Sequence, residues 1–382
     1  MRTLRFRRRR SGNVLVLALF MMIGMMGVIA LAVDIGYLKV VNTEIQRSAD
    51  SAAIAAANRL IEEQRLPGQS EPSYSQTRAT AGQYAGLNKV ALAEPALAVD
   101  DVSLGYMAYP FGLTSQLVTQ SAPLVNGVRV RIRRTQEQNG EVSLFVARAL
   151  GFHNQSMEGK ATAAFVASFR GFRSPTPTGN VMFLPFALDE ETWVNLTVSG
   201  TDNWRYDPLT GHVSLGADQI REVNLYPQGT GAPGNRGTVD IGSPNNSTCD
   251  IKRQIVNGIS PADLAFLGGK IELGPDGTLP LHADTGVSAG FKAELESIIG
   301  QTRMIPIFRG PVSGNGNNAI YTIVGFAGVR VLDVKLTGNP NEKHVFVQPA
   351  YVKAPGAIPS TTNTSQFIYS PVCLVHDGGQ GQ

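Results

Sequence analysis

Side chains capable of catalysis are scattered along this 382-residue chain and form no complete catalytic set. The five histidines show neither H-x-x-x-H nor H-E-x-x-H spacing, so they do not form a recognisable zinc site. The chain also lacks the G-x-x-x-x-G-K-[ST] phosphate loop, and its one G-x-S-x-G string, at 286–290, is too short a pattern to identify a hydrolase by itself. Asp276-Gly277 follows a Gly-Pro pair, which indicates a turn with too few acids around it for a calcium loop. The sequence therefore predicts no enzyme, no metal site and no cofactor.

The two cysteines, Cys249 and Cys373, are the remaining reactive groups. Two cysteines are too few for a disulfide framework, and their separation fits no metal-ligand spacing. On the oxidising side of a membrane they would be candidates for one disulfide that closes a long loop. The alternative is two buried free thiols, since nothing in the sequence shows that they are close together.

The net charge of +3 is concentrated at the N-terminus. Residues 1–13 contain six arginines and no acid, so the remainder of the chain has a net charge of −3. A globular nucleic-acid-binding protein carries its basic patch on the folded part. We therefore expect no nucleic-acid partner.

An uninterrupted apolar run extends from Val14 to Val33. As a helix it would span ~30 Å, the thickness of the hydrocarbon core of a bilayer. A buried core helix rarely lacks polar positions over such a length, so we predict a transmembrane helix. Because the arginines lie on one side only, the positive-inside rule places residues 1–13 in the cytoplasm and everything after Asp34 outside it.

Two kinds of proteolytic processing are alternatives to a retained membrane anchor. Residues 30–32, Ala-Leu-Ala, have the pattern of a signal-peptidase site, although the apolar run is longer than that of a usual signal peptide. Basic residues followed by Gly12, Asn13 and a long apolar helix are the arrangement of a type IV prepilin, which is cleaved after the glycine. Prepilins usually have a glutamate where this chain has Leu17, so processing at Gly12 lacks that support.

The helix is predicted to continue beyond the membrane, because no Gly or Pro occurs between Tyr37 and Ile61. Small and apolar side chains recur there at helical spacing. They are Ile45, Ala49, Ala53, Ala56 and Leu60. Small side chains let another element approach closely. Two interpretations stay open: a stalk that packs on its own ectodomain, and a helix that packs beside other subunits of a filament or complex.

Asp34 and Gly36 mark the exit from the membrane. Asp34 lies where the hydrocarbon core ends, and we interpret it as a hydrated stop signal that caps nothing. The alternative is a contact with a partner inside the membrane, because an acid at that depth is costly unless it is paired.

Taken together, these segments resemble the N-terminal region of the TadG-like proteins of the Flp (tight adherence, Tad) pilus-assembly system. The features that carry the resemblance are, in chain order, the Arg-rich start, Gly12, Asn13, the apolar run, Asp34, Gly36 and the Ala-rich segment 44–57. Ile45 stands where the family has Leu, and Ser48 replaces one Ala. The resemblance covers an eighth of the chain. It implies a membrane-anchored component of pilus assembly or of a related export machine, and it does not imply an enzyme.

The rest of the chain has the pattern of a loop-rich α+β ectodomain. Residues 128–133 alternate Val or Ile with Arg129, Arg131 and Arg133, which predicts a half-buried strand with a solvated arginine face. This strand and the segments after it also resemble the ectodomain region of TadE- and TadG-like proteins. Helices are expected at 76–87, 248–257, 260–267 and 287–299, and strands at 161–169, 181–188, 193–198, 304–308, 319–336 and 344–347. Residues 142–150 fit a strand or a helix, and 229–247 a long loop.

The expected organisation has six parts. They are a basic cytoplasmic tail (1–13), a transmembrane helix (14–33), an Ala-rich helical stalk (34–66), an α+β domain (67–170), a linker (171–180) and a C-terminal α+β domain (181–382). The fold class is therefore α+β, with a single N-terminal transmembrane helix that extends into a stalk.

We expect a single-pass protein of the inner membrane that acts through contacts of its stalk helix and ectodomain. The expected partners are the lipid bilayer, other pilus-assembly subunits and a second copy bound through the Ala-rich helix. The alternative is a surface ligand-binding protein or adhesin for a glycan or a cell. In that case Trp193, Trp204 and Tyr206 would stack on sugars, although aromatics this close in sequence more often belong to a core.

Overall fold

The computed structural model describes residues 13–112, 115–119, 124–226, 236–314, 318–362 and 364–376. The chain divides into two compact units, each built from separate stretches of sequence. The first unit contains Met1–Ala56, Arg78–Ser103 and Val128–Ala163, and the second contains Ala57–Thr77, Leu104–Gly127 and Ala164–Gln382. Helices and strands are mixed along the chain after one long N-terminal helix, which confirms the predicted α+β class.

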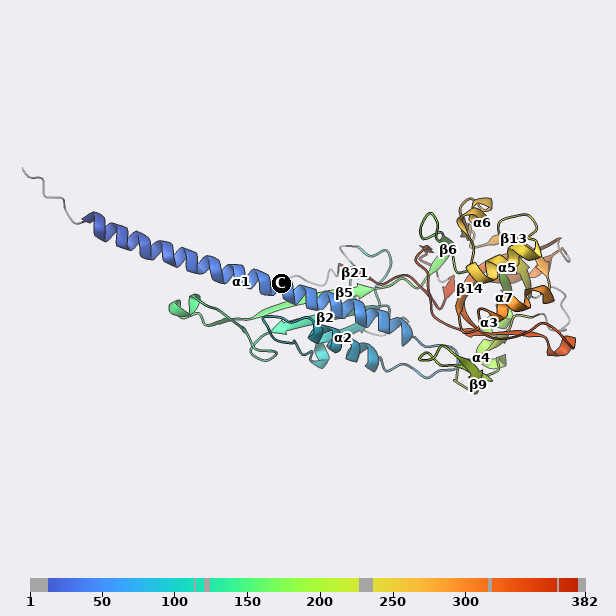
Figure 1. Cartoon of the computed structure of the whole chain (residues 1–382), viewed down its shortest axis with the longest axis horizontal. Helices are drawn as coiled ribbons and strands as arrows, with labels where there is room; N and C mark the ends of the chain where they lie inside the picture. Colours follow the sequence, from blue (N-terminus) through green and yellow to red (C-terminus); the bar gives the residue numbers. More distant parts are fainter. Residues whose placement is uncertain are drawn as a thin grey trace, which may run out of the picture. The chain divides into compact units, whose positions relative to one another are not determined.

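Helix α1 runs without a break over Asn13–Glu62 and joins the predicted membrane segment to the predicted stalk (Figure 1). Its 50 residues correspond to ~75 Å at the rise of an α-helix. The large apolar side chains from Val14 to Val33 are 52–80% exposed. So much exposed apolar surface is unfavourable in water and suits a segment surrounded by lipid. The N-terminal arginines and Gly12 lie outside the described residues.

The first unit packs one helix and a sheet against α1. Helix α2 (Ser75–Leu87) and the 3₁₀ turn η1 (Val99–Asp101) precede strand β1 (Val102–Gly105). Strand β1 is followed in the sheet by β2 (Gly127–Arg134) and then β5 (Met157–Ala164). Between β2 and β5, the short strands β3 (Val142–Ser143) and β4 (Asn154–Gln155) pair in antiparallel fashion. The connection between β3 and β4 contains the 3₁₀ turn η2 (Ala147–Leu150).

The second unit is organised around an eight-stranded sheet. Its members are β7 (Phe186–Asp189), β10 (Val223–Asn224), β11 (Arg236–Val239), β13 (Leu279–Thr285), β14 (Thr302–Ser313), β15 (Ala319–Lys335), β16 (His344–Pro349) and β19 (Ser365–Gln366). Strand β15 pairs with both β13 and β14, and β14 pairs in turn with β7. The strands β15, β13, β11, β7 and β14 therefore close into a barrel, which leaves no free edge among them.

Smaller elements complete the second unit. The helices are α3 (Glu190–Val194), α4 (Leu196–Ser199), α5 (Thr248–Asn257), α6 (Pro261–Phe266) and α7 (Lys292–Glu296), with the 3₁₀ turns η3 (Ala289–Phe291) and η5 (Pro340–Glu342). The additional strands are β6 (Phe169–Arg173), β8 (Trp204–Tyr206), β9 (Val213–Leu215), β12 (Lys270–Glu272), β17 (Val352–Lys353), β18 (Ala357–Pro359), β20 (Ile368–Tyr369) and β21 (Cys373–Val375). Two large apolar clusters, one around Phe172 and Phe326 and the other around Phe186 and Leu295, form most of its core.

Several predicted elements agree with the structure because their signals are local. Helix α5 occupies the predicted residues, and α6 begins after Ser260, whose Oγ accepts a hydrogen bond from the N–H of Asp263 at 3.2 Å. The expected break in 319–336 is a register shift near Gly325 within the continuous strand β15. Gly328 is required there, because an added Cβ would lie 2.5 Å from two backbone oxygens.

Other predictions are wrong. Residues 193–198 were expected as a strand but lie in α3 and α4, because Asp189 accepts a hydrogen bond from the N–H of Thr192 and starts a helix. The expected linker 171–180 begins inside β6, where Phe172 is fully buried opposite β12. The expected loop 229–247 contains β11, and the expected helix 287–299 is reduced to η3 and α7. The expected strand 161–169 is divided between β5 and β6.

Candidate functional site: the exit clamp and the docked stalk

Asp34, the first residue after the apolar run, is bound by the backbone of the β3–β4 connection. Its Oδ1 accepts a hydrogen bond from the N–H of Phe145 at 2.8 Å. Its Oδ2 accepts from the N–H groups of Val146 at 3.0 Å and Ala147 at 2.6 Å. We call Asp34 and these three N–H groups the exit clamp. The first N–H groups of a helical turn such as η2 have no acceptor within the turn itself. The Asp34 carboxylate supplies that acceptor.

The exit clamp keeps Asp34 ionised although its side chain is only 3% exposed. The N–H of Ala147 is the strongest of the groups that hold the pKa of Asp34 below its ordinary value, and burial opposes it. The interpretation of Asp34 as a hydrated residue that caps nothing is therefore wrong. Its neighbour Gly36 is exposed, and a Cβ added there would have no atom within 4 Å.

The helical face predicted for stalk packing is covered by the chain itself. Its five residues, Ile45, Ala49, Ala53, Ala56 and Leu60, are each 0% exposed. Ser48 Oγ donates to the backbone oxygen of Ala85 in α2 at 3.1 Å. Gly159 of β5 lies so close to Ile45 that an added Cβ would be 2.5 Å from Ile45 Cγ2. Two interpretations of the stalk were left open by the sequence. In the structure, the stalk packs on the protein's own ectodomain.

The arginines of β2 are held by a buried acid. The Asp101 carboxylate, whose side chain is 0% exposed, forms ion pairs with Arg131 Nε at 3.2 Å and with Arg133 Nε at 2.7 Å. Asp101 raises the pKa of Arg133 through this contact. Two arginines of the predicted solvated face are thus paired with a single carboxylate. A phosphate would have to displace Asp101 to bind there.

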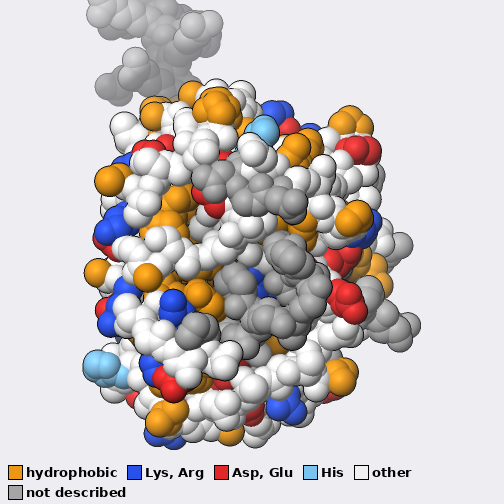
Figure 2. Space-filling model, turned by 90° about the vertical axis from the view of Figure 1, so that its right-hand side faces the viewer, with side chains coloured by type: hydrophobic (Ala, Val, Ile, Leu, Met, Phe, Trp, Pro, Cys, Tyr) orange, Lys and Arg blue, Asp and Glu red, His pale blue; other side chains and the backbone are white. Residues whose placement is uncertain are grey.

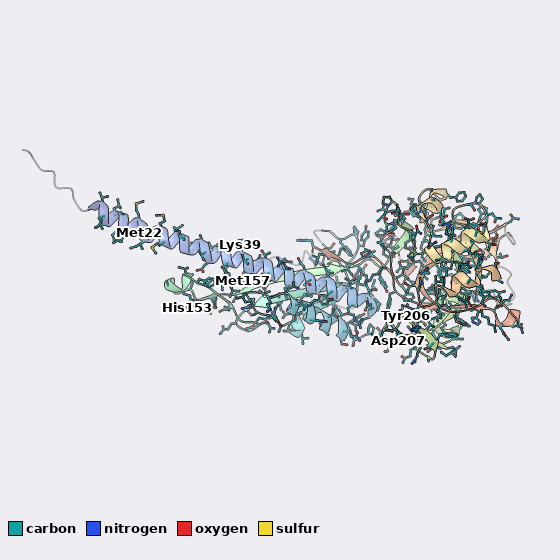
Figure 3. The ribbon with its side chains drawn as sticks, in the orientation of Figure 1. Met22, Lys39, His153, Met157, Tyr206 and Asp207 are labelled. Carbon is teal, nitrogen blue, oxygen red and sulfur yellow. The ribbon has the colours of Figure 1, made fainter. Side chains whose placement is uncertain are left out.

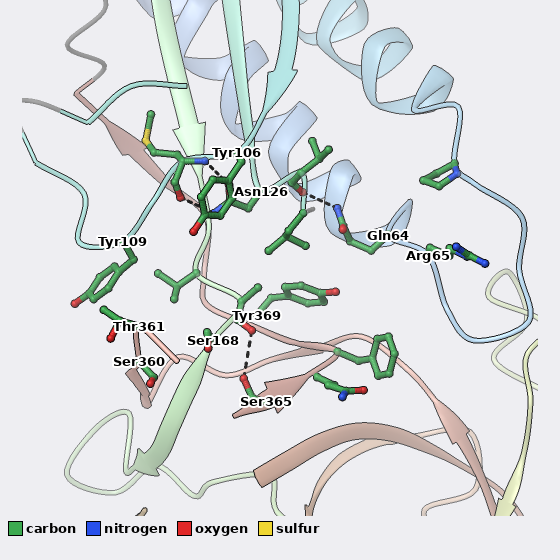
Figure 4. Close-up of a pocket in the computed structure, with 18 of the residues that line it drawn as sticks. Gln64, Arg65, Tyr106, Tyr109, Asn126, Ser168, Ser360, Thr361, Ser365 and Tyr369 are labelled. Carbon is green, nitrogen blue, oxygen red and sulfur yellow. Dashed lines mark hydrogen bonds between the residues drawn. The ribbon is translucent and has the colours of Figure 1, made fainter. Parts of the chain in front are cut away.

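A cavity of ≈ 640 Å³ in the second unit is lined by polar and aromatic residues (Figure 4). Asn126 Nδ2 donates to the backbone oxygens of Met107 and Phe165, both at 3.0 Å, and its Oδ1 accepts from the N–H of Met107. Gln64 Nε2 donates to two further backbone oxygens. These amides hold the cavity wall together, so they have little capacity left to bind a ligand.

The structure offers no evident catalytic centre among the described residues. No group of three or more His, Cys, Asp or Glu side chains could hold a metal ion in the part of the chain that the structure describes. His344 forms a pair with Asp333, with 2.5 Å between Nε2 and Oδ2. Its Nδ1 faces the backbone oxygen of Glu342 at 2.7 Å, so both ring nitrogens are occupied. Neither nitrogen is available to activate a nucleophile.

The two cysteines are not joined in the structure. Cys249, in the first turn of α5, and Cys373, in β21, are free and exposed. Cys373 Sγ lies 3.6 Å from the backbone oxygen of Ala164. The geometry therefore gives the expected disulfide no support.

The aromatic residues considered for sugar stacking do not form a common exposed platform. Trp193 is 6% exposed, and its Nε1 donates to Gln366 Oε1 at 3.1 Å. The ring of Tyr206 is covered by the guanidinium of Arg330, with Cζ 3.4 Å from the ring centroid. Trp204 is only partly exposed, in β8. This arrangement does not favour a glycan-binding adhesin.

Comparisons with known proteins single out the N-terminal part of the chain. Residues 12–59 match the family model for putative Flp pilus-assembly TadE/G-like proteins. Residues 46–163 match the model for putative Tad-like Flp pilus-assembly proteins. No curated protein and no solved structure gives a significant match.

The matched residues include α1, the exit clamp, α2 and the sheet of the first unit. They support a membrane-associated component of pilus assembly, with one N-terminal helix long and apolar enough to cross a bilayer. The resemblance seen in the sequence is thereby confirmed: residues 12–163 are similar to TadE/G-like and Tad-like proteins of Flp pilus assembly.

Proposed function

We propose that this protein is a non-enzymatic, single-pass component of Tad-type pilus assembly that acts through protein contacts of its ectodomain. The observation that supports this most strongly is the continuity of α1. One helix joins an apolar, exposed segment to a stalk that is buried within a Tad-type ectodomain. Such a helix anchors the first unit to the membrane. The arginines of residues 1–13 favour a cytoplasmic N-terminus and insertion in the inner membrane.

The partner-binding surface must lie outside the Ala-rich face. Ala49, Ala53 and Ala56 are fully buried, so self-association through them would require the first unit to open. Figure 2 shows one face of the molecule, on which apolar side chains are scattered among charged ones. The second unit exposes Val198 by 88%, Leu209 by 94% and Leu215 by 72%. We propose that these three side chains contribute to contacts with other pilus-assembly subunits.

The test is recovery of partners with the full-length protein extracted from its native membrane. We expect pilus-assembly subunits to be recovered, and fewer of them with Val198→Asp or Leu215→Asp. The matched control is Leu87→Asp, because Leu87 is also apolar and exposed but belongs to the first unit. Recovery of no pilus subunit, together with glycan binding by the same protein, would overturn the proposal in favour of an adhesin.

Sequencing the N-terminus of the mature protein tests the anchor separately. We expect α1 to retain its apolar segment. A mature N-terminus at Val33 would show signal-peptide cleavage and would remove the anchor. An N-terminus at Asn13 would instead show prepilin-type processing, which keeps the apolar segment.

We also expect no binding of nucleic acid. Residues 14–382 have a net charge of −3, and two of the arginines on β2 are paired with Asp101. Retention of the protein on a DNA or RNA column at physiological salt would contradict this part of the proposal.

A further inference from the structure

Two exposed phenylalanines lie at the end of the β3–β4 hairpin, which we call the tip (residues 144–153). Phe145 is 62% exposed and Phe152 is 66% exposed. Val146, beside Phe145, is 37% exposed. Apolar side chains gathered at a protruding turn are costly in water, and they commonly mark a surface that contacts another apolar phase.

The tip is held next to the end of the apolar run of α1. The exit clamp ties Phe145, Val146 and Ala147 to Asp34, which directly follows Val33. The Tyr37 ring packs edge-on against the Phe145 ring, with 4.9 Å between the centroids. Figure 3 shows His153 beside the stretch of α1 between Met22 and Lys39. All these residues belong to the first unit.

The charges of the tip suit a phospholipid surface. The tip contains Arg148 and His153 and no acid, and both side chains are exposed. The carboxylate that binds the tip, that of Asp34, accepts from backbone N–H groups and is 3% exposed. Aromatic and aliphatic side chains combined with a cation are the usual composition of segments that enter the headgroup region of a bilayer.

We propose that the tip is a second membrane contact of this protein. Phe145, Val146 and Phe152 enter the boundary between headgroups and acyl chains in the leaflet that α1 leaves, and Arg148 binds lipid phosphate. The occupant of this surface is therefore the anionic bilayer itself and not another protein. The inference rests on the proposed crossing of the membrane by Val14–Val33.

The experiment places one extra tryptophan at a time in the full-length protein and measures quenching by brominated lipids. The protein is reconstituted in vesicles of phosphatidylcholine and phosphatidylglycerol, brominated near the headgroup end of the acyl chain. The test variants are Phe145→Trp and Phe152→Trp. The signal of the parent chain, which has two native tryptophans, is subtracted from each variant.

Two control positions bracket the test. Phe20→Trp lies within the apolar run, where the native side chain is 68% exposed, so it reports whether α1 crosses the bilayer. Leu87→Trp replaces a side chain that is 69% exposed and lies two residues from Ala85, whose backbone oxygen binds Ser48. Ser48 follows Asp34 by roughly four helical turns, or ~20 Å, so this position should be well clear of the lipid. Trypsin digestion patterns equal to that of the parent chain show which variants are folded.

We expect quenching of F145W and F152W to approach that of F20W, and L87W to be unquenched. Weaker quenching in vesicles of phosphatidylcholine alone, with Arg148→Gln abolishing that difference, would support the phosphate contact. Quenching of F20W without quenching of F152W would overturn the tip contact and leave the membrane crossing intact. Absence of quenching in F20W would overturn the crossing and the inference together. If the introduced tryptophan of F152W becomes shielded from water only after pilus subunits are added, the tip is a protein contact and the inference is overturned.

Discussion

The close approach of β5 to α1 provides a sharp test of whether the stalk is docked on its own ectodomain. Gly159 of β5 has no side chain, and a Cβ added there would lie 2.5 Å from Ile45 Cγ2. Carbon atoms in contact prefer ~3.5–4.0 Å, so the substitution Gly159→Ala demands a displacement of ~1 Å. Ile45 is fully buried and cannot move aside without displacing its neighbours.

The expected cost of Gly159→Ala is that of overpacking, about 1–3 kcal/mol. Ile45→Ala alone costs about 2–5 kcal/mol, because it leaves a cavity in the same place. In the double variant the new Cβ partly fills the space that Cγ2 vacates. The losses of stability in the two single variants should therefore not add. The double variant should lose about 0.5–3 kcal/mol less than the sum of the two single losses.

Hydrogen exchange followed by mass spectrometry measures this in the full-length protein in nanodiscs. Peptides that cover residues 41–56 of α1 and 157–163 of β5 report local opening of the first unit. With Gly159→Ala we expect their exchange to accelerate about 5- to 150-fold, since each 1.4 kcal/mol is a factor of ten.

The control is Gly82→Ala in α2, where an added Cβ meets no atom within 4 Å and helix propensity favours alanine. Exchange in that variant should be unchanged or slower. Unaltered exchange in Gly159→Ala, or strictly additive losses in the double variant, would refute the docked stalk.

Three further outcomes are expected. Asp34→Asn should speed cleavage by trypsin at Arg148 while cleavage at Lys89 is unchanged, because an amide nitrogen would face the N–H groups of the exit clamp. In the wild type, the ionised Asp34 stabilises the tip fully above its ordinary pKa of 3.8, and this stabilisation is lost as the pH falls through the lower pKa of the folded state. Release of the tip from the wild-type protein at neutral pH would therefore contradict this prediction. Asn126→Ala should lower the urea-unfolding free energy of the second unit by about 2–4 kcal/mol, since it leaves backbone groups of Met107 and Phe165 unpaired, whereas Asn180→Ala should change it by less than about 1 kcal/mol. A membrane-impermeant maleimide should label both Cys249 and Cys373 in non-reduced spheroplasts, because both are exposed; a disulfide-linked peptide pair in the map would refute the free thiols.

The sequence allowed prediction of features that depend on neighbouring residues. The continuous helix α1 follows from an apolar run joined to a stretch without Gly or Pro, and α6 follows from Ser260 and Asp263. The closed barrel of the second unit could not be predicted in the same way. Strand β11 is four residues long and contains a glycine, and its pairing with β7 joins residues about fifty positions apart. Its status as a strand depends on those partners and not on its own composition.

The exit clamp shows the same limit at the candidate site. Asp34 was recognised as an unusual residue, but its partners follow it by 111 to 113 positions and are backbone groups. Any residue type except proline can supply an N–H group, so no motif marks them. Asp101 and the arginines of β2 differ in this respect, because their charged side chains can be recognised in the sequence. They are separated by about thirty positions, however, so the sequence does not show that they pair.

The unbroken α1 has a consequence for how the ectodomain responds to its lipid environment. A transmembrane helix adjusts to a thinner bilayer by tilting. Here the tilted segment continues as the same helix to Glu62 without proline, and the exit clamp fastens the first unit at the point where the helix emerges. A hinge at the membrane surface is therefore missing from the described part of the helix. The thickness of the bilayer would therefore set the tilt of the first unit relative to the membrane. A lateral force on that unit would be transmitted along α1 as a torque on the membrane-spanning segment.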